Sequence, residues 1–174
     1  MAGHPLGGAA NHTPWHRDGS GSGDRGPAES VTAVDASIVV EWLTPQTDEH
    51  LPGRELLDLW QRADEELLAP RLLFEETLNA LLTGVRRGRC GTVVADAAAG
   101  LLTDLPVRVA DTTRDRDRAW ELSRRYDNWP VYDMVYVALA ERLGHRLVTA
   151  HRRLVTRLGH LDWIVGPEVA LGGS

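Results

Sequence analysis

The chain contains no lysine, because all 19 of its Lys and Arg residues are arginines. This absence excludes a phosphate-binding P-loop, a receiver domain that uses a lysine beside its aspartate, and any enzyme that forms a Schiff base through a side-chain amine. Only one cysteine, Cys90, is present, so no disulfide and no four-cysteine zinc site can form within one chain. A single cysteine fits a reducing, cytoplasmic setting.

The sequence also lacks internal repeats and any apolar run long enough to cross a membrane. Residues 1–30 are rich in Gly, Pro, Ala and Ser and have no periodic apolar pattern, which predicts a disordered N-terminal tail. The tail has no apolar core of the kind that a secretion signal needs. We therefore expect a tail over residues 1–30 and one folded domain over residues 31–174, with no membrane association.

The net charge of −6 argues against a protein that its overall charge holds to nucleic acid. The charges are unevenly distributed, since acidic residues predominate over residues 31–107 and arginines over residues 108–157. The second half could therefore present a basic surface, although solvated helix faces explain such charges equally well.

Short apolar segments alternate with helical patterns from Val31 onward. The pattern predicts strands at residues 31–34, 67–69, 107–110, 146–149 and 161–165, and helices at residues 37–43, 53–66, 72–87, 92–102, 114–126 and 131–143. This alternation is typical of an α/β domain with a mainly parallel sheet of four or five strands.

The first predicted strand ends at an aspartate, in the stretch VTAVDAS. In an open α/β sheet, ligands bind beyond the carboxyl ends of the strands, which is where Asp35 falls. Asp35 could instead cap the following helix, although Ser37 could do that as well. Position alone leaves both interpretations open.

Two further acidic positions lie on predicted helices. Asp133 falls in the first turn of its helix among apolar or amphipathic neighbours, where an unpaired charge would be costly to bury, although it could also interact with the helix dipole. Glu75 and Glu76 are adjacent, and periodicity does not choose between them. Glu76 lies roughly opposite an expected apolar stripe of Phe74, Leu78, Leu81 and Val85. Three acids on three separate elements suggest a hard divalent cation such as Mg²⁺ or Mn²⁺.

Four segments, VDASIVVEWL, APRLLFEETLNALL, VYDMVYVALAERLG and RLVTAHRRL, occur in the order and spacing of PIN-domain proteins. From about Val31 to Val165 the chain resembles this family, and most of all the VapC toxins of bacterial toxin–antitoxin pairs. The resemblance implies a three-layer α/β/α fold and metal-dependent cleavage of RNA. It also implies a cognate antitoxin whose C-terminal segment occupies the site, and commonly a homodimer.

The resemblance assigns the catalytic and metal-binding acids to Asp35, to Glu76 rather than Glu75, and to Asp133, which is followed by Met134 where the family usually has alanine. The fourth family acid is replaced, because the chain reads TAH and places His151 there. Imidazole is a poorer ligand for magnesium than a carboxylate and a better one for manganese or zinc.

Four neighbouring residues are further candidates. Ser37 and Thr149 could orient a water at the ion from behind the carboxylates. Arg152 and Arg153 directly follow the site and are candidates for contacts to RNA phosphates, although polar residues are common in any loop after a strand.

The sequence thus predicts an endoribonuclease that uses Mg²⁺ or Mn²⁺ to polarise the scissile phosphate and activate water, leaving a 5′-phosphate and a 3′-hydroxyl. An alternative is a catalytically weakened PIN module that mainly binds its antitoxin or RNA, which the substitution at His151 favours. A DNA nuclease would share the same metal chemistry.

Overall fold

The computed structural model describes residues 30–44 and 51–172. The predicted tail, apart from Ser30, lies outside the described residues. None of the helices in the described part of the chain has the length and apolar character needed to span a bilayer.

Five parallel strands form one sheet in the order β3-β2-β1-β4-β5. The strands are β1 (Val31–Val34), β2 (Glu66–Ala69), β3 (Arg108–Val109), β4 (Arg146–Val148) and β5 (Ile164–Val165). The prediction of a parallel sheet of four or five strands is therefore confirmed. The third and fifth strands are shorter than the sequence pattern predicts.

Helices connect and cover the strands. They are α1 (Ala36–Leu43), α2 (Pro52–Ala63), α3 (Leu72–Arg86), α4 (Thr92–Gly100), α5 (Thr113–Arg125), α6 (Val131–Leu143), α7 (Arg152–Leu158) and α8 (Pro167–Ala170), with a 3₁₀ turn at Leu102–Asp104. The bounds of α6 match the prediction to the residue. The sequence reading did not anticipate α7 and α8.

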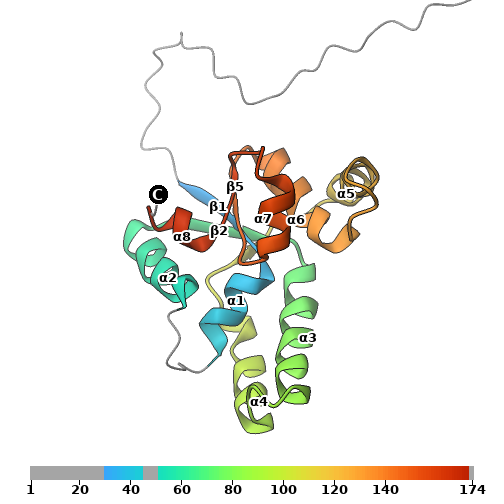
Figure 1. The fold of residues 1–174 in the computed structure, drawn as a ribbon. Coiled ribbons are helices and arrows are strands. Elements are labelled where there is room, and N and C mark those ends of the chain that lie inside the picture. Colours follow the sequence, from blue (N-terminus) through green and yellow to red (C-terminus); the bar gives the residue numbers. More distant parts are fainter. Residues whose placement is uncertain (1–29, 45–50, 173–174) are drawn as a thin grey trace, which may run out of the picture.

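The direction of the chain across the sheet reverses between β1 and β4. From β1 the chain moves outward to β2 and β3, then crosses back to β4 and continues to β5. Right-handed crossovers in opposite directions place the connecting helices on opposite faces of the sheet, which gives the three-layer α/β/α arrangement. Figure 1 shows α3 and α4 projecting together from one side, away from α5, α6 and α7.

The buried face of α3 differs from the predicted stripe. Leu73, Thr77, Leu81 and Gly84 are its buried residues, whereas Leu78 is 40% exposed. The helix packs against both α1 and α4, so contacts on two sides, rather than one apolar stripe, determine which residues are covered. The helix ends at Arg86, one residue before the predicted end, and Gly88 follows at a φ of 67°, a left-handed conformation that glycine adopts without strain.

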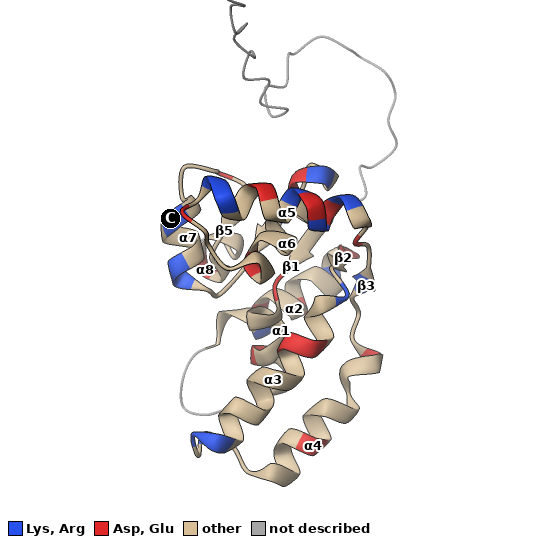
Figure 2. Ribbon diagram, turned by 90° about the vertical axis from the view of Figure 1, so that its right-hand side faces the viewer, with Lys and Arg blue, Asp and Glu red and all other residues tan. Residues whose placement is uncertain are grey.

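Ion pairs join the arginine-rich α5 to α6. Arg118 binds Glu141 at 2.6 Å, and Arg142 binds the buried Asp115 at 2.6 Å. Burial alone would raise the pKa of Asp115, but hydrogen bonds from Arg142 and Thr112 outweigh it and hold this pKa below its usual range. Figure 2 shows basic and acidic residues side by side on α5. Part of the expected basic surface is therefore neutralised within the domain, where it fixes the position of α6.

Candidate active site

Asp35 follows β1 directly, at the carboxyl edge of the sheet where the strand order reverses. Its Oδ1 accepts a hydrogen bond from the backbone N–H of Ser37 at 2.8 Å, so Asp35 is the N-cap of α1. The residue is only 6% exposed. Asp35 therefore caps the helix and also places a buried carboxylate at the edge where ligands bind in such sheets.

Glu76 reaches this edge from α3. Its Oε2 accepts a hydrogen bond from the hydroxyl of Tyr136 at 2.7 Å, and Tyr136 is fully buried on α6. The adjacent Glu75 is exposed. Of the two adjacent acids, only Glu76 is half-buried and held by a partner from another element.

Asp133 lies in the first turn of α6, and both of its carboxylate oxygens have contacts. Oδ2 accepts a hydrogen bond from Nε1 of Trp129 at 2.5 Å. Oδ1 lies 3.4 Å from Nδ1 of His151. The sequence motifs do not predict a role for Trp129. The position of Trp129, four residues before Asp133 and next to Pro130, is the signal that could have indicated such a role.

Ser37 and Thr149 contact the turn that carries His151. The hydroxyl of Ser37 accepts a hydrogen bond from the backbone N–H of Ala150 at 2.9 Å, and the hydroxyl of Thr149 accepts one from the backbone N–H of His151 at 3.0 Å. The two hydroxyl oxygens lie 3.5 Å apart. Both side chains therefore fix the turn between β4 and α7, and with it the position of the imidazole beside Asp133.

Burial, more than charge pairing, determines the electrostatics of Asp35 and Glu76. Burial is the main cause that raises the pKa of Asp35, and the negative charge of Asp133 adds to it, while hydrogen bonds from Ser37 lower it. Burial likewise raises the pKa of Glu76 to about 7; the hydrogen bond from Tyr136 lowers it, and the charges of Asp35 and Asp133 raise it. His151 opposes both shifts. The four side chains thus share one electrostatic environment that would favour a bound cation.

The chemistry of these donors fits a hard divalent cation, because three carboxylates supply oxygen ligands. Among the described residues, however, no three His, Cys, Asp or Glu side chains stand close enough together to hold a metal ion as they are placed. Asp133 contributes to this separation, because one of its oxygens contacts Trp129 and the other contacts His151. Binding one ion with all three acids would therefore require these side chains to move closer together.

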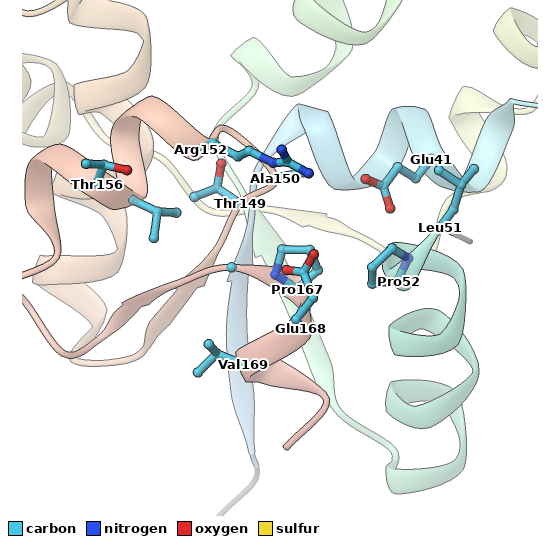
Figure 3. A pocket seen from close by; sticks show the side chains of 12 residues that line it. Glu41, Leu51, Pro52, Thr149, Ala150, Arg152, Thr156, Pro167, Glu168 and Val169 are labelled. Atoms are coloured by element: carbon cyan, nitrogen blue, oxygen red, sulfur yellow. The ribbon is translucent and has the colours of Figure 1, made fainter. Parts of the chain in front are cut away.

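Two clefts adjoin the site, and Arg152 lines both. The larger, of about 580 Å³, lies between α1, the start of α2 and α8, and its lining includes Glu41, Pro52, Thr149 and Glu168 (Figure 3). The second, of about 500 Å³, is lined by Trp129, Arg152, Arg153, Thr156 and Arg157.

Arg152 and Arg153 lie on a helix, contrary to the expectation of a loop. They begin α7, whose Leu154 and Leu158 are buried. These two leucines, four residues apart in the stretch RRLVTRL, are a helical signal that the sequence reading overlooked.

A parallel α/β domain with acidic side chains at the point where its strand order reverses belongs to the class of enzymes and binding proteins that hold ligands at that edge. Residues 32–159 match the model of the PIN domain. The chain is therefore a member of the PIN domain family. A comparison with curated proteins finds no match.

Solved structures share this fold. PAE2754 from Pyrobaculum aerophilum superposes with a TM-score of 0.62 at 23% identity, over 84% of this chain and 96% of that one. VapC20 from Mycobacterium tuberculosis, described as a Sarcin-Ricin loop cleaving toxin, gives 0.50 at 24% identity, over 67% and 86%. A toxin–antitoxin complex from Klebsiella pneumoniae gives 0.54 at 13% identity, over 78% and 97%. The expected resemblance to the family is confirmed, and at these identities the likeness establishes the fold.

The raised pKa of Glu76 predicts a pH-dependent cost to stability. Because the folded state keeps the Glu76 proton up to about pH 7 and the unfolded state loses it near its ordinary pKa of 4.5, the free energy of unfolding falls as the pH rises through this window. We expect Glu76→Gln, which retains an acceptor for Tyr136, to raise Tm in EDTA at about pH 8 and to leave it unchanged at about pH 4.

Thermal unfolding of Glu76→Gln and of the matched variant Glu75→Gln, each at both pH values, measures this effect. Glu75 is exposed, so its variant should follow the wild type. Equal Tm values for wild type and Glu76→Gln at the higher pH would contradict the conclusion that the fold raises the pKa of Glu76.

Proposed function

We propose that the protein is a metal-dependent endoribonuclease and the toxin of a VapBC-type toxin–antitoxin pair. The observation that carries this proposal is that Asp35, Glu76 and Asp133, from three separate elements, lie at the carboxyl edge of the sheet within reach of one another's charge. Burial, with the charges of neighbouring acids added to it, raises the pKa values of Asp35 and Glu76, and a bound cation would relieve this condition.

Asp35, Glu76 and Asp133 would hold Mg²⁺ or Mn²⁺. When bound, such an ion supplies a Lewis acid that polarises a phosphodiester and makes water a stronger acid. Ser37 keeps Oδ1 of Asp35 in place, and Tyr136 keeps Oε2 of Glu76 in place. Glu76, with a pKa of about 7, must give up its proton to become a ligand, so we expect ion binding to strengthen as the pH rises toward neutrality and beyond.

Family membership and the neighbouring toxin folds support this assignment. VapC20 is described as a toxin that cleaves the Sarcin-Ricin loop, and a second neighbour as a toxin–antitoxin complex. We transfer from them the class of activity, hydrolysis of RNA, and the class of partner, a cognate antitoxin. The identity of the RNA and the formation of a homodimer remain predictions.

An exposed apolar surface supports a protein partner. The hairpin of α3 and α4 exposes large apolar side chains, among them Leu82 at 62% and Val93 at 81%, and Leu101 directly after α4 is 54% exposed. Figure 2 shows few charged residues on these two helices. Apolar surface of this kind marks interaction sites, and an antitoxin is the partner that the proposed function requires.

A second candidate, a weakened PIN module that binds antitoxin or RNA, is favoured by the arrangement around Asp133. Its two oxygens already contact Trp129 and His151, and His151 supplies no negative charge to the site. In this alternative, the imidazole reduces the affinity for magnesium and the protein acts mainly by binding.

Cleavage of labelled total RNA by the purified, antitoxin-free protein tests the nuclease. We expect cuts with Mg²⁺ or Mn²⁺, none with EDTA, and a rate at least about 100-fold lower for Asp133→Asn, because removing a ligand of the ion removes several kcal/mol of transition-state stabilisation. The exposed neighbour of the site gives the matched control, since Glu75→Gln should cut as the wild type does. Absence of cleavage with either metal, from folded protein, would favour the binding module.

Replacing His151 with aspartate tests how this histidine affects activity. We expect His151→Asp to increase the Mg²⁺-dependent rate by about 10- to 100-fold, because a carboxylate suits magnesium better than an imidazole does and residues beside a metal site typically have effects of this size. Rates in Mg²⁺ and in Mn²⁺ should be compared with those of His145→Asp, a histidine outside the site. An unchanged rate for His151→Asp would mean that the position is dispensable for catalysis.

A further inference from the structure

We propose that Trp129, with Arg152, Arg153 and Arg157, forms a groove that binds one segment of a single-stranded nucleic acid, in which the indole stacks on a base and the arginines contact phosphates. This inference rests on the proposed function and adds to it a means of placing the substrate. We call these four residues and Thr156 the Trp129 groove.

The groove has a volume of about 500 Å³ and carries charge of one sign. Its arginines come from α7, where residues 152, 153, 156 and 157 follow helical spacing and so lie along one side of the helix. Arg152 and Arg153 are exposed and have no hydrogen bond or ion pair within the described part of the chain. Arg157 pairs with Asp127. At least two guanidinium groups are thus free to bind phosphate, for which their planar, forked geometry is well suited.

Trp129 is fixed beside the acidic site. Its backbone N–H donates to the carbonyl oxygens of Ser123 and Tyr126, each at 3.2 Å, and its indole N–H donates to Asp133 at 2.5 Å. The preceding residues, Asp127 and Asn128, both have a φ of 58°, a left-handed conformation that costs energy and turns the chain into this position. The ring is therefore held rigidly, and it adjoins both the arginines and the carboxylates.

A rigid aromatic ring next to cations is the arrangement that binds single strands, because unpaired bases stack on aromatic side chains while basic groups follow the backbone. The larger cleft on the other side of Arg152 is less suited to this ligand, because Glu41 and Glu168 line it and would repel phosphates (Figure 3). Because Trp129 precedes Asp133 by only four residues and its indole lies within hydrogen-bond distance of that carboxylate, a base stacked in the groove would place a neighbouring phosphodiester close to the acidic residues.

Fluorescence anisotropy with a labelled single-stranded RNA oligonucleotide tests the groove. The measurement uses the full chain carrying Glu76→Gln, in EDTA, so that RNA is bound and not cut. We expect Trp129→Ala to weaken binding by about 5- to 100-fold, the range observed when one stacking residue is removed. Trp129→Phe loses the hydrogen bond to Asp133 but keeps an aromatic ring, so the affinity of this variant for the RNA should stay much closer to that of the parent protein.

Two matched controls isolate the contribution of stacking. Trp120 is 65% exposed on α5 outside the groove, and Trp120→Ala should not change the affinity. An oligonucleotide of the same length with abasic nucleotides should bind Trp129→Ala and the parent protein equally, because no base is present to stack.

The arginines are tested through the salt dependence of binding. We expect Arg153→Gln to make the slope of log K against log salt shallower by about 0.7, the value for one lost phosphate contact on a single strand. Arg62→Gln, on α2, should leave the slope unchanged.

The outcomes separate this inference from the nuclease proposal. Equal affinities for Trp129→Ala and Trp120→Ala would overturn the groove while leaving metal-dependent cleavage intact. Binding that depends on Trp129 in a protein that never cleaves RNA would support the groove and contradict the nuclease. Failure of the parent protein to bind the RNA would overturn the groove, and tight binding of an acidic peptide there would assign it to a protein partner.

Discussion

The burial of carboxylates at one edge of the sheet, with the repulsion between them added to it, is the constraint on which the site depends. Asp35 follows β1, Glu76 lies on α3 and Asp133 lies on α6, and the fold brings them to the same edge. The protein stabilises each one locally, through Ser37, Tyr136, and the pair of Trp129 and His151. These contacts orient the oxygens without neutralising the site, because among the partners only the imidazole can carry a positive charge. A bound cation would relieve the cost of holding the acids there.

The sheet topology makes this gathering possible. The chain reverses its direction across the sheet between β1 and β4, so the residues after these two strands face a common edge, and the helices that follow diverge to opposite faces. The ion pairs from α5 to α6 fix the helix that carries both Asp133 and Tyr136. Packing far from the site is thus connected to it through a single helix.

Helices and strands with a strong apolar pattern are predicted well from the sequence. Features that depend on contacts between different elements are predicted poorly. Helix α6 and strand β1 were correct to the residue because their apolar residues are continuous and their ends are marked by Pro130 and Asp35. The prediction of the buried face of α3 was partly wrong because two neighbouring helices cover this helix. Helix α7 was missed because seven residues with three arginines give a weak apolar signal. Glu76 was distinguished from Glu75 only through the family resemblance, and Trp129 was invisible because its bond to Asp133 depends on the turn at Asp127 and Asn128.

The central claim is that Asp35, Glu76 and Asp133 together bind one divalent cation, and anomalous diffraction tests it most directly. Crystals of the full chain would be grown with Mn²⁺ at about pH 8, where Glu76 is ionised. We predict an anomalous peak in contact with all three carboxylates, with Asp133 turned away from Trp129. A manganese-containing crystal with no peak there, and with Asp133 still bonded to Trp129 and His151, would contradict it.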